Sequence, residues 1–273
     1  MVALTTGIVA ALADGNGSTA ARLLDALYAK EPNHPDLAAF DRLLESLERL
    51  HLPVPDAGEL LEFITAITPS AHRLLGARAR ALLTPQWRRL AEALRARPYS
   101  PHQPLLHASY AWTQTQDWDE VRASVLSEPQ WWRHAALGVR LVLSNLRQRR
   151  RTEGLAAWFQ LCWQAPREAG VAVEMLRNSE LYALWQRFIE ADIETLDTDD
   201  FPAWLLLHEP ALARHLSVDL PLGSSPAENH YRLVHRWLAA RAAGLEAQDL
   251  ALRKQLKALQ PTLFACLLRS LTP

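Results

Sequence analysis

The amino-acid sequence predicts an all-α fold, arranged as a superhelical stack of antiparallel helix hairpins (an α-solenoid). The first observation is composition: the 273-residue chain has only 10 Gly and is 49% hydrophobic, and its dominant residues, Leu, Ala, Arg, Glu and Gln, include the best helix formers. The second is periodicity, since apolar residues recur at intervals of three and four and strand-like alternation is almost absent. The third is the distribution of prolines, because proline-rich turns divide the chain into short segments.

Charge and cysteine content exclude several classes of protein. The chain carries 29 basic and 30 acidic residues, and its hydrophobic content excludes intrinsic disorder. Cys162 and Cys266 have no partner spacing, so a reducing compartment is expected and we predict a cytoplasmic protein. The apolar N-terminus has no preceding Lys or Arg, so we interpret it as a first helix and not as a secretory signal. No uncharged stretch is long enough to span a membrane.

The periodic pattern predicts helices along the whole chain, about seventeen of them with lengths of roughly 10–20 residues. The first is expected at Val2 to Asp14 and the last at Pro261 to Leu271. Between them, the apolar positions spaced by three and four include Leu23, Leu24 and Leu27; Phe40, Leu43, Leu44 and Leu47; Leu60, Leu61, Ile64 and Ile67; Leu137, Leu141 and Val142; and Leu252, Leu256 and Leu259.

Capping residues and prolines predict where several helices begin. Asp117 to Glu120 and Ser225 to Glu228 have the form of capping boxes. Thr68-Pro69 and Thr84-Pro85 are also expected to begin helices, because proline at the first helical position lacks only a donor that would be unused there. Asp199-Asp200 precedes another expected helix, since acidic residues favour a helix N-terminus.

The spacing of prolines predicts a repeat of hairpins. The intervals between Pro32 and Pro69, Pro129 and Pro166, Pro166 and Pro202, and Pro226 and Pro261 are 37, 37, 36 and 35 residues. These values lie in the range of two-helix repeats. The chain, residues 1–273, is therefore expected to form a single helical-repeat domain, with a weak division near residues 98–104 and a loop at 218–226.

One repeat near the N-terminus has a recognisable pattern. Ala20, Leu24, Leu27 and Pro32 stand at offsets 0, +4, +7 and +12. A small residue there lets two helices approach, larger apolar residues fill the contact, and proline ends the hairpin. Residues 1–36 thus resemble a tetratricopeptide repeat, although the Trp and Gly of that family are absent. Later segments keep the spacing of helix hairpins but not the full residue pattern. The resemblance therefore implies a tetratricopeptide-like or HEAT-like solenoid.

An arginine run is the clearest concentration of charge. Arg147, Arg149, Arg150 and Arg151 are expected at the C-terminal end of a long helix that begins near Glu128. Positive charge at that end complements the helix dipole and can be a solvated feature without a partner. The functional hypothesis is an anion site for an acidic peptide, a phosphate group or nucleic acid.

Ten tryptophans are the most unusual feature of the composition. Most are expected in the core, because an indole buries a large apolar area. Trp131 and Trp132 are adjacent, however, so on a helix they would point about 100° apart. Trp and Arg dominate binding hot spots. We therefore predict a partner-binding surface formed by Trp132, Arg133, Arg140 and Trp158.

Catalytic and metal-binding motifs are not found. Nucleophile elbows, P-loops, dinucleotide fingerprints and zinc-ligand spacings are all missing, so neither a catalytic residue, a metal nor a cofactor is predicted. We predict a non-catalytic adaptor or scaffold that binds a peptide or a partner helix in a concave groove. The apolar terminal helices indicate a further possibility of self-association.

The alternative function is a nucleic-acid-binding protein, or a DNA glycosylase-like enzyme, built on a HEAT-like solenoid. Abundant Trp together with the run Arg147 to Arg151 resembles the alkylpurine DNA glycosylases, which use aromatic residues beside a positively charged channel. The balanced overall charge speaks against it, since proteins that grip nucleic acid usually carry a basic excess.

Overall fold

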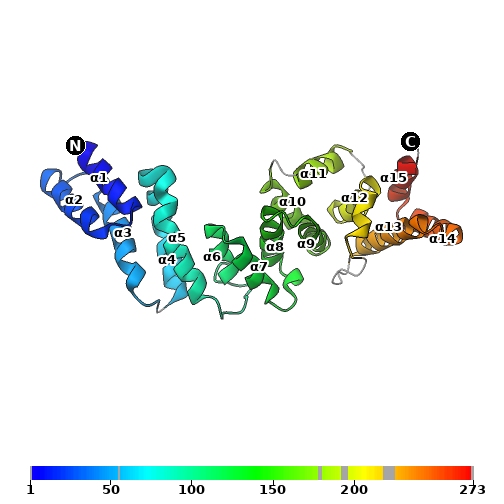
Figure 1. Cartoon of the computed structure of the whole chain (residues 1–273), viewed down its shortest axis with the longest axis horizontal. Coiled ribbons are helices and arrows are strands. Elements are labelled where there is room, and N and C mark those ends of the chain that lie inside the picture. The colour runs from blue at the N-terminus through cyan, green and yellow to red at the C-terminus, as the bar shows by residue number, and fades with distance from the viewer. Residues whose placement is uncertain (1, 55, 178–179, 192–195, 218–224, 272–273) are drawn as a thin grey trace. The chain divides into compact units, whose positions relative to one another are not determined.

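The structure, a computed structural model, describes residues 2–54, 56–177, 180–191, 196–217 and 225–271. All regular secondary structure in these ranges is helical, which confirms the all-α prediction (Figure 1). Contacts group the chain into two compact units, unit 1 at Met1–Ser124 and unit 2 at Val125–Pro273. Residues 98–104 lie inside unit 1, and most of the expected loop at 218–226 lies outside the described residues.

The helices of unit 1 are α1 (Val2–Ala13), α2 (Gly17–Lys30), α3 (Leu37–Glu48), α4 (Ala57–Leu75), α5 (Ala79–Ala93), α6 (Ala108–Thr115) and α7 (Trp118–Leu126), whose last turn crosses the unit boundary, with short 3-10 turns η1 (Arg49–His51) and η2 (Gly76–Arg78). Unit 2 contains η3 (Trp131–Arg133), α8 (Ala135–Arg147), α9 (Arg151–Gln164), α10 (Pro166–Glu174), α11 (Glu180–Glu190), η4 (Thr198–Asp200), α12 (Phe201–His208), η5 (Pro210–Arg214), α13 (Pro226–Ala242), α14 (Glu246–Leu259) and α15 (Pro261–Leu271).

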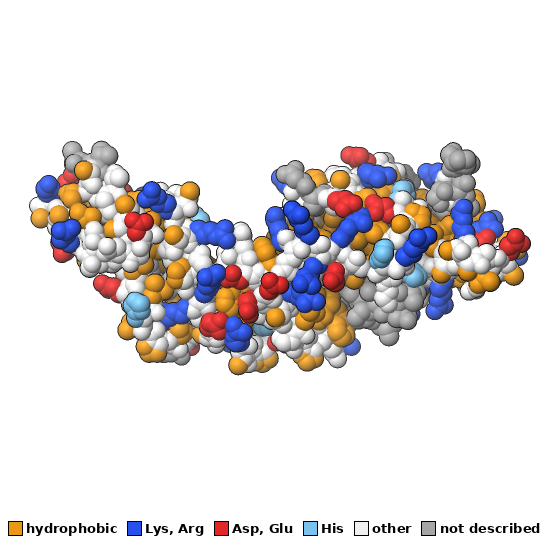
Figure 2. Space-filling view, viewed as in Figure 1, with side chains coloured by type: hydrophobic (Ala, Val, Ile, Leu, Met, Phe, Trp, Pro, Cys, Tyr) orange, Lys and Arg blue, Asp and Glu red, His pale blue; other side chains and the backbone are white. Residues whose placement is uncertain are grey.

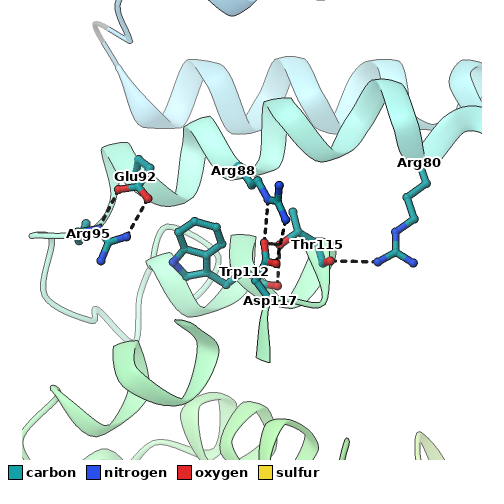
Figure 3. Close-up of polar contacts among 7 residues, drawn as sticks. All are labelled: Arg80, Arg88, Glu92, Arg95, Trp112, Thr115 and Asp117. Carbon is teal, nitrogen blue, oxygen red and sulfur yellow. Dashed lines mark hydrogen bonds and ion pairs between the residues drawn. The ribbon is translucent and has the colours of Figure 1, made fainter. Parts of the chain in front are cut away.

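Unit 1 is built by packing of consecutive helices, with α1 also contacting α3, α4 and α5. Its core contains the periodic leucines and isoleucines, among them Leu12, Leu43 and Ile64, which are completely buried. Polar contacts join α5 to the segment that follows it (Figure 3). The Arg80 guanidinium donates to the Thr115 carbonyl over 3.1 Å, and the same view shows the buried Trp112 ring beside this contact region.

Two expected helix starts in unit 1 are wrong. Pro69 lies inside α4, which begins instead after Asp56, whose carboxylate accepts from the Gly58 and Glu59 amides. Pro85 likewise lies inside α5. Both prolines are exposed, so the carbonyl that each leaves without an amide partner can be hydrated. The prediction began a new helix at each of these prolines. Solvent exposure explains why α4 and α5 instead continue through them.

Unit 2 is organised around α9, which is buried on nearly all sides. Leu155 and every residue from 157 to 163 are buried, as expected for a helix that neighbours surround. α8, α10, α12, η3 and η4 all contact it. A close approach to α8 occurs at Gly154, where an added Cβ would lie 2.5 Å from Leu146 Cδ2. Glycine thus permits the close α8–α9 contact.

Aromatic rings fill much of the core of unit 2. Trp158 is completely buried and lies 4.6 Å from Phe201 and 5.5 Å from Trp185, measured between ring centroids. Its indole N–H donates to the Ala169 carbonyl over 3.2 Å, so the polar atom is satisfied. These contacts join α9 to α10, α11 and α12.

The other expected helix boundaries have mixed outcomes. Ser225 caps α13 through the Ala227 amide, and the terminal helices agree with prediction to within one residue. The long helix expected from Glu128 is wrong: Gln130 has a positive φ of 62° and His134 is extended, so α8 begins only at Ala135. Within the described ranges, no helix combines the length and the hydrophobicity needed to cross a bilayer.

Candidate partner-binding site

The surface predicted from Trp132, Arg133, Arg140 and Trp158 does not include all four side chains. Trp158 has no exposed area and is a core residue, so its expected role in partner binding is wrong. Arg140 is only 7% exposed, on α8. Trp132 is half-buried and Arg133 is exposed, both in η3. Trp132 packs edge-on against Trp131 at 6.0 Å, so its ring has an intramolecular partner.

The predicted anion patch turns out to be divided among separate local interactions. Arg147 ends α8, Arg149 has a positive φ of 61°, and Arg151 begins α9. Arg151 forms ion pairs with Glu180 at 2.8 Å and Glu209 at 2.7 Å. Arg150 lies 3.9 Å from Glu153.

Neighbouring acids therefore compensate much of this charge. Figure 2 shows the same feature at the surface, where acidic and basic side chains intermingle over the part of unit 2 around α8, α9 and α11. Arg149 and Arg151, with Glu180, also border a cavity of about 310 Å³ whose floor is formed by leucines, namely Leu146, Leu155, Leu181 and Leu184.

A larger groove of about 640 Å³ lies between η5 and the C-terminal half of α13, and we call it the η5–α13 groove. Its volume falls in the range typical of ligand sites. Most of its lining is apolar. The apolar lining residues are Pro210, Ala211 and Ala213 of η5 and Trp237, Leu238, Ala239 and Ala242 of α13.

Hydrogen bonds hold two rings of the groove in place. Trp237 is 3% exposed, and its indole N–H donates to the Asp249 carboxylate on α14. The His235 Nε2 atom lies 2.9 Å from the Leu216 carbonyl oxygen and donates to it, because a carbonyl can only accept. The groove wall is thus fixed by contacts on both sides of α13.

The polar residues of the lining are two arginines and one histidine, Arg214, Arg241 and His235. Arg214 of η5 and Arg241 of α13 are exposed, and none of the described lining residues is acidic. Among the described residues, no carboxylate forms an ion pair with either arginine. The Arg241 guanidinium carbon lies 5.6 Å from the centroid of the Trp237 ring, a cation–π arrangement. The groove thus has an apolar floor and, at its edge, positive charge that no carboxylate of the described residues pairs.

The buried carboxylate of Asp200, elsewhere in unit 2, has structural partners. Asp200 is 5% exposed; its Oδ1 lies 2.7 Å from His230 Nδ1, and its Oδ2 accepts from Gln260 Nε2 at 3.3 Å. These bonds join η4 to α13 and to the turn before α15. α12 begins at Phe201, as the acidic pair before it predicted. In the ranges that the structure describes, no three His, Cys, Asp or Glu side chains converge as metal ligands would.

Sequence reasoning missed the η5–α13 groove, although a signal for it exists. Glu228 is the one acidic residue of the helix 226–242, and it pairs with Arg232 four residues later at 2.6 Å. Arg241 has no acidic residue three or four positions away, so the i,i+4 rule leaves it unmatched. The position of η5 beside α13 is tertiary and could not be read from spacing.

Comparison of the chain with protein-family models, curated proteins and solved structures gave no match.

Proposed function

We propose that this protein is a non-catalytic adaptor that binds a segment of a partner protein in the η5–α13 groove. The observation that carries the proposal is the combination of an apolar floor with arginines that no described carboxylate pairs. Concave apolar surface with Arg and aromatic residues is the usual composition of a binding hot spot. Such a site needs no catalytic group.

The proposal includes a stacked-hairpin architecture in the cytoplasm. Packing of consecutive helices, such as α1 with α2, α8 with α9, and α13 with α14, supports the hairpin arrangement. The free cysteines Cys162 and Cys266 support a reducing compartment, because both are buried without forming a disulfide.

The apolar terminal helices give weaker support to self-association. Ile8 and Leu12 of α1, and Leu263 and Leu267 of α15, are buried within their own units. Leu268 of α15 is exposed, with 46% of its area accessible. The groove is therefore the better partner site.

Selection from a library of random short peptides tests the proposed function on the full chain. The substitution Ala239→Arg places a long side chain in the groove at an exposed helical position, and Ala251→Arg makes the same change on α14 outside it. Arginine is a good helix former, so neither change should unfold its helix.

We expect peptides enriched on the wild-type chain to lose binding to the Ala239→Arg variant and to keep it with Ala251→Arg. Failure to enrich any peptide, or equal binding to both variants, would contradict an adaptor role for this groove. The nucleic-acid alternative is checked in parallel with a heparin column, on which strong, salt-sensitive retention would favour it.

A further inference from the structure

We infer that the η5–α13 groove selects partner segments that combine apolar residues with internal Asp or Glu side chains. This inference rests on the proposed function and specifies the chemistry of the partner. It is carried by the charge of the lining, in which Arg214, Arg241 and His235 are the ionisable side chains and no described lining residue is acidic.

Two acidic residues next to the groove, Asp249 and Glu209, are engaged by other groups. Asp249 accepts the Trp237 N–H and also pairs with Arg253 at 2.9 Å. Glu209, which precedes the first residue of η5, pairs with Arg151 at 2.7 Å. Neither carboxylate is therefore committed to Arg214 or Arg241, and no other carboxylate of the described residues pairs with them.

Arg241 is positioned to bind a carboxylate without a large ordering cost. Its guanidinium lies over the Trp237 ring, which is itself fixed by its bond to Asp249. Among the described residues the Arg241 guanidinium donates no hydrogen bond, so its N–H groups are available for paired bonds to a carboxylate. Lysine at this position could contact the ring but would lack the paired donors.

The two arginines belong to different elements, η5 and α13, and so offer two separate points of attachment. A chain terminus supplies a single carboxylate, whereas an internal segment can supply two. The apolar lining of the groove, which includes Pro210, Ala211 and Leu238, favours hydrophobic residues in the same segment. Internal acidic side chains beside apolar ones satisfy both parts of the groove.

The test uses the same random peptide library in two formats, with the peptide displayed internally and with its C-terminus free. It compares the wild-type chain with Arg214→Gln, Arg241→Gln and the double variant. Arg187→Gln on α11, exposed and outside the lining, serves as the matched control. A labelled single-stranded oligonucleotide is titrated against the same proteins.

We expect internally displayed peptides selected on the wild-type chain to be enriched in Asp and Glu. That enrichment should disappear with the double variant and persist with Arg187→Gln. Binding of the best acidic peptide should fall about tenfold for each groove arginine removed, as expected for a charge-assisted bond. Added salt should weaken it further.

Four results would overturn the inference, and the first two of them leave the proposed adaptor role intact. If the selected peptides bind in the groove but are not enriched in Asp and Glu, the adaptor role stands and the acidic character of the partner is rejected. Preference for the free C-terminal format would assign the carboxylate to a chain terminus. Oligonucleotide binding that needs Arg214 and Arg241, with no peptide selected, would assign the charge to phosphate. Absence of both ligands would reject the adaptor role and this inference together.

Discussion

Arg88 of α5 holds Asp117, the residue before α7, through two parallel hydrogen bonds, Nε to Oδ2 at 2.9 Å and a terminal nitrogen to Oδ1 at 3.0 Å (Figure 3). Thr115 donates to the same carboxylate at 2.7 Å. The Arg88 hydrogen bond is the main cause that lowers the pKa of Asp117 below its ordinary value of 3.8, against the opposing effect of burial. This pair fixes the turn between α6 and α7 against α5.

Replacing Asp117 with Asn should destabilise the protein by about 1 kcal/mol near neutral pH, since the pair is partly exposed. The folded-state pKa is lowered, so this stabilisation is present above pH 3.8 and is lost as the pH falls through the lower value. Denaturant unfolding of both proteins at about pH 7 and about pH 2 measures the difference. A penalty that is equal at both pH values would show that the carboxylate charge is not its source.

Gly154→Ala should destabilise unit 2 by about 1–3 kcal/mol, because the new methyl group would overlap Leu146 in the α8–α9 contact. Gly170→Ala is the matched control. There an added Cβ finds its nearest atom, in Trp185, at 4.0 Å, so alanine should stabilise α10 by about 0.5–1 kcal/mol. Thermal unfolding separates the two outcomes, and a gain for Gly154→Ala would mean that Leu146 moves away without cost.

Trp158→Ala should cost about 3–5 kcal/mol, since it opens a cavity in a fully buried aromatic cluster. The same substitution at Trp132, which is half-buried in η3, should cost about 1 kcal/mol or less. Where Trp158→Ala does not fold, Trp158→Phe provides a milder version with a measurable transition. Similar losses at both positions would place Trp132 in the core as well.

Both cysteines should react slowly with thiol reagents in the native protein. Burial raises the pKa of the Cys162 thiol well above its ordinary value of 9.0 and also raises that of Cys266, so little reactive thiolate exists near neutral pH. Cys266 should react first, because it borders a cavity of about 430 Å³. Modification of Cys266→Ser measures Cys162 alone, and rapid labelling of that variant before unfolding would contradict its burial.

The helical class and most helices were predictable because they depend on local periodicity and composition. The buried sets of α3 and α4, including Phe40, Leu43, Leu60 and Ile64, contain residues that the three-and-four spacing selected. Pro69 and Pro85 were misleading because a proline's effect depends on whether solvent reaches the carbonyl that it frees, which local sequence does not reveal.

The candidate site was much less predictable, because it depends on contacts between residues distant in sequence. In the sequence, the charge of Arg151 lies in the basic run 147–151 and no partner for it is evident. In the structure it pairs with Glu180 and Glu209, which lie 29 and 58 residues away. Neither Arg214 nor Arg241 belongs to a charge cluster. The one local signal, the lack of an acidic residue three or four positions from Arg241, does not show that η5 lies beside α13. Composition identifies the residue types of a binding surface, whereas tertiary packing decides which of them remain unpaired.

The aromatic core of unit 2 determines what an optical measurement on this chain reports. Three of the ten tryptophans precede residue 124 and seven follow it. Tryptophan fluorescence therefore reports mainly on unit 2. Within that unit, Trp158 and Trp185 lie close enough for energy transfer between their rings. Far-ultraviolet circular dichroism instead samples both units through their backbones, and the two signals diverge wherever the units melt separately.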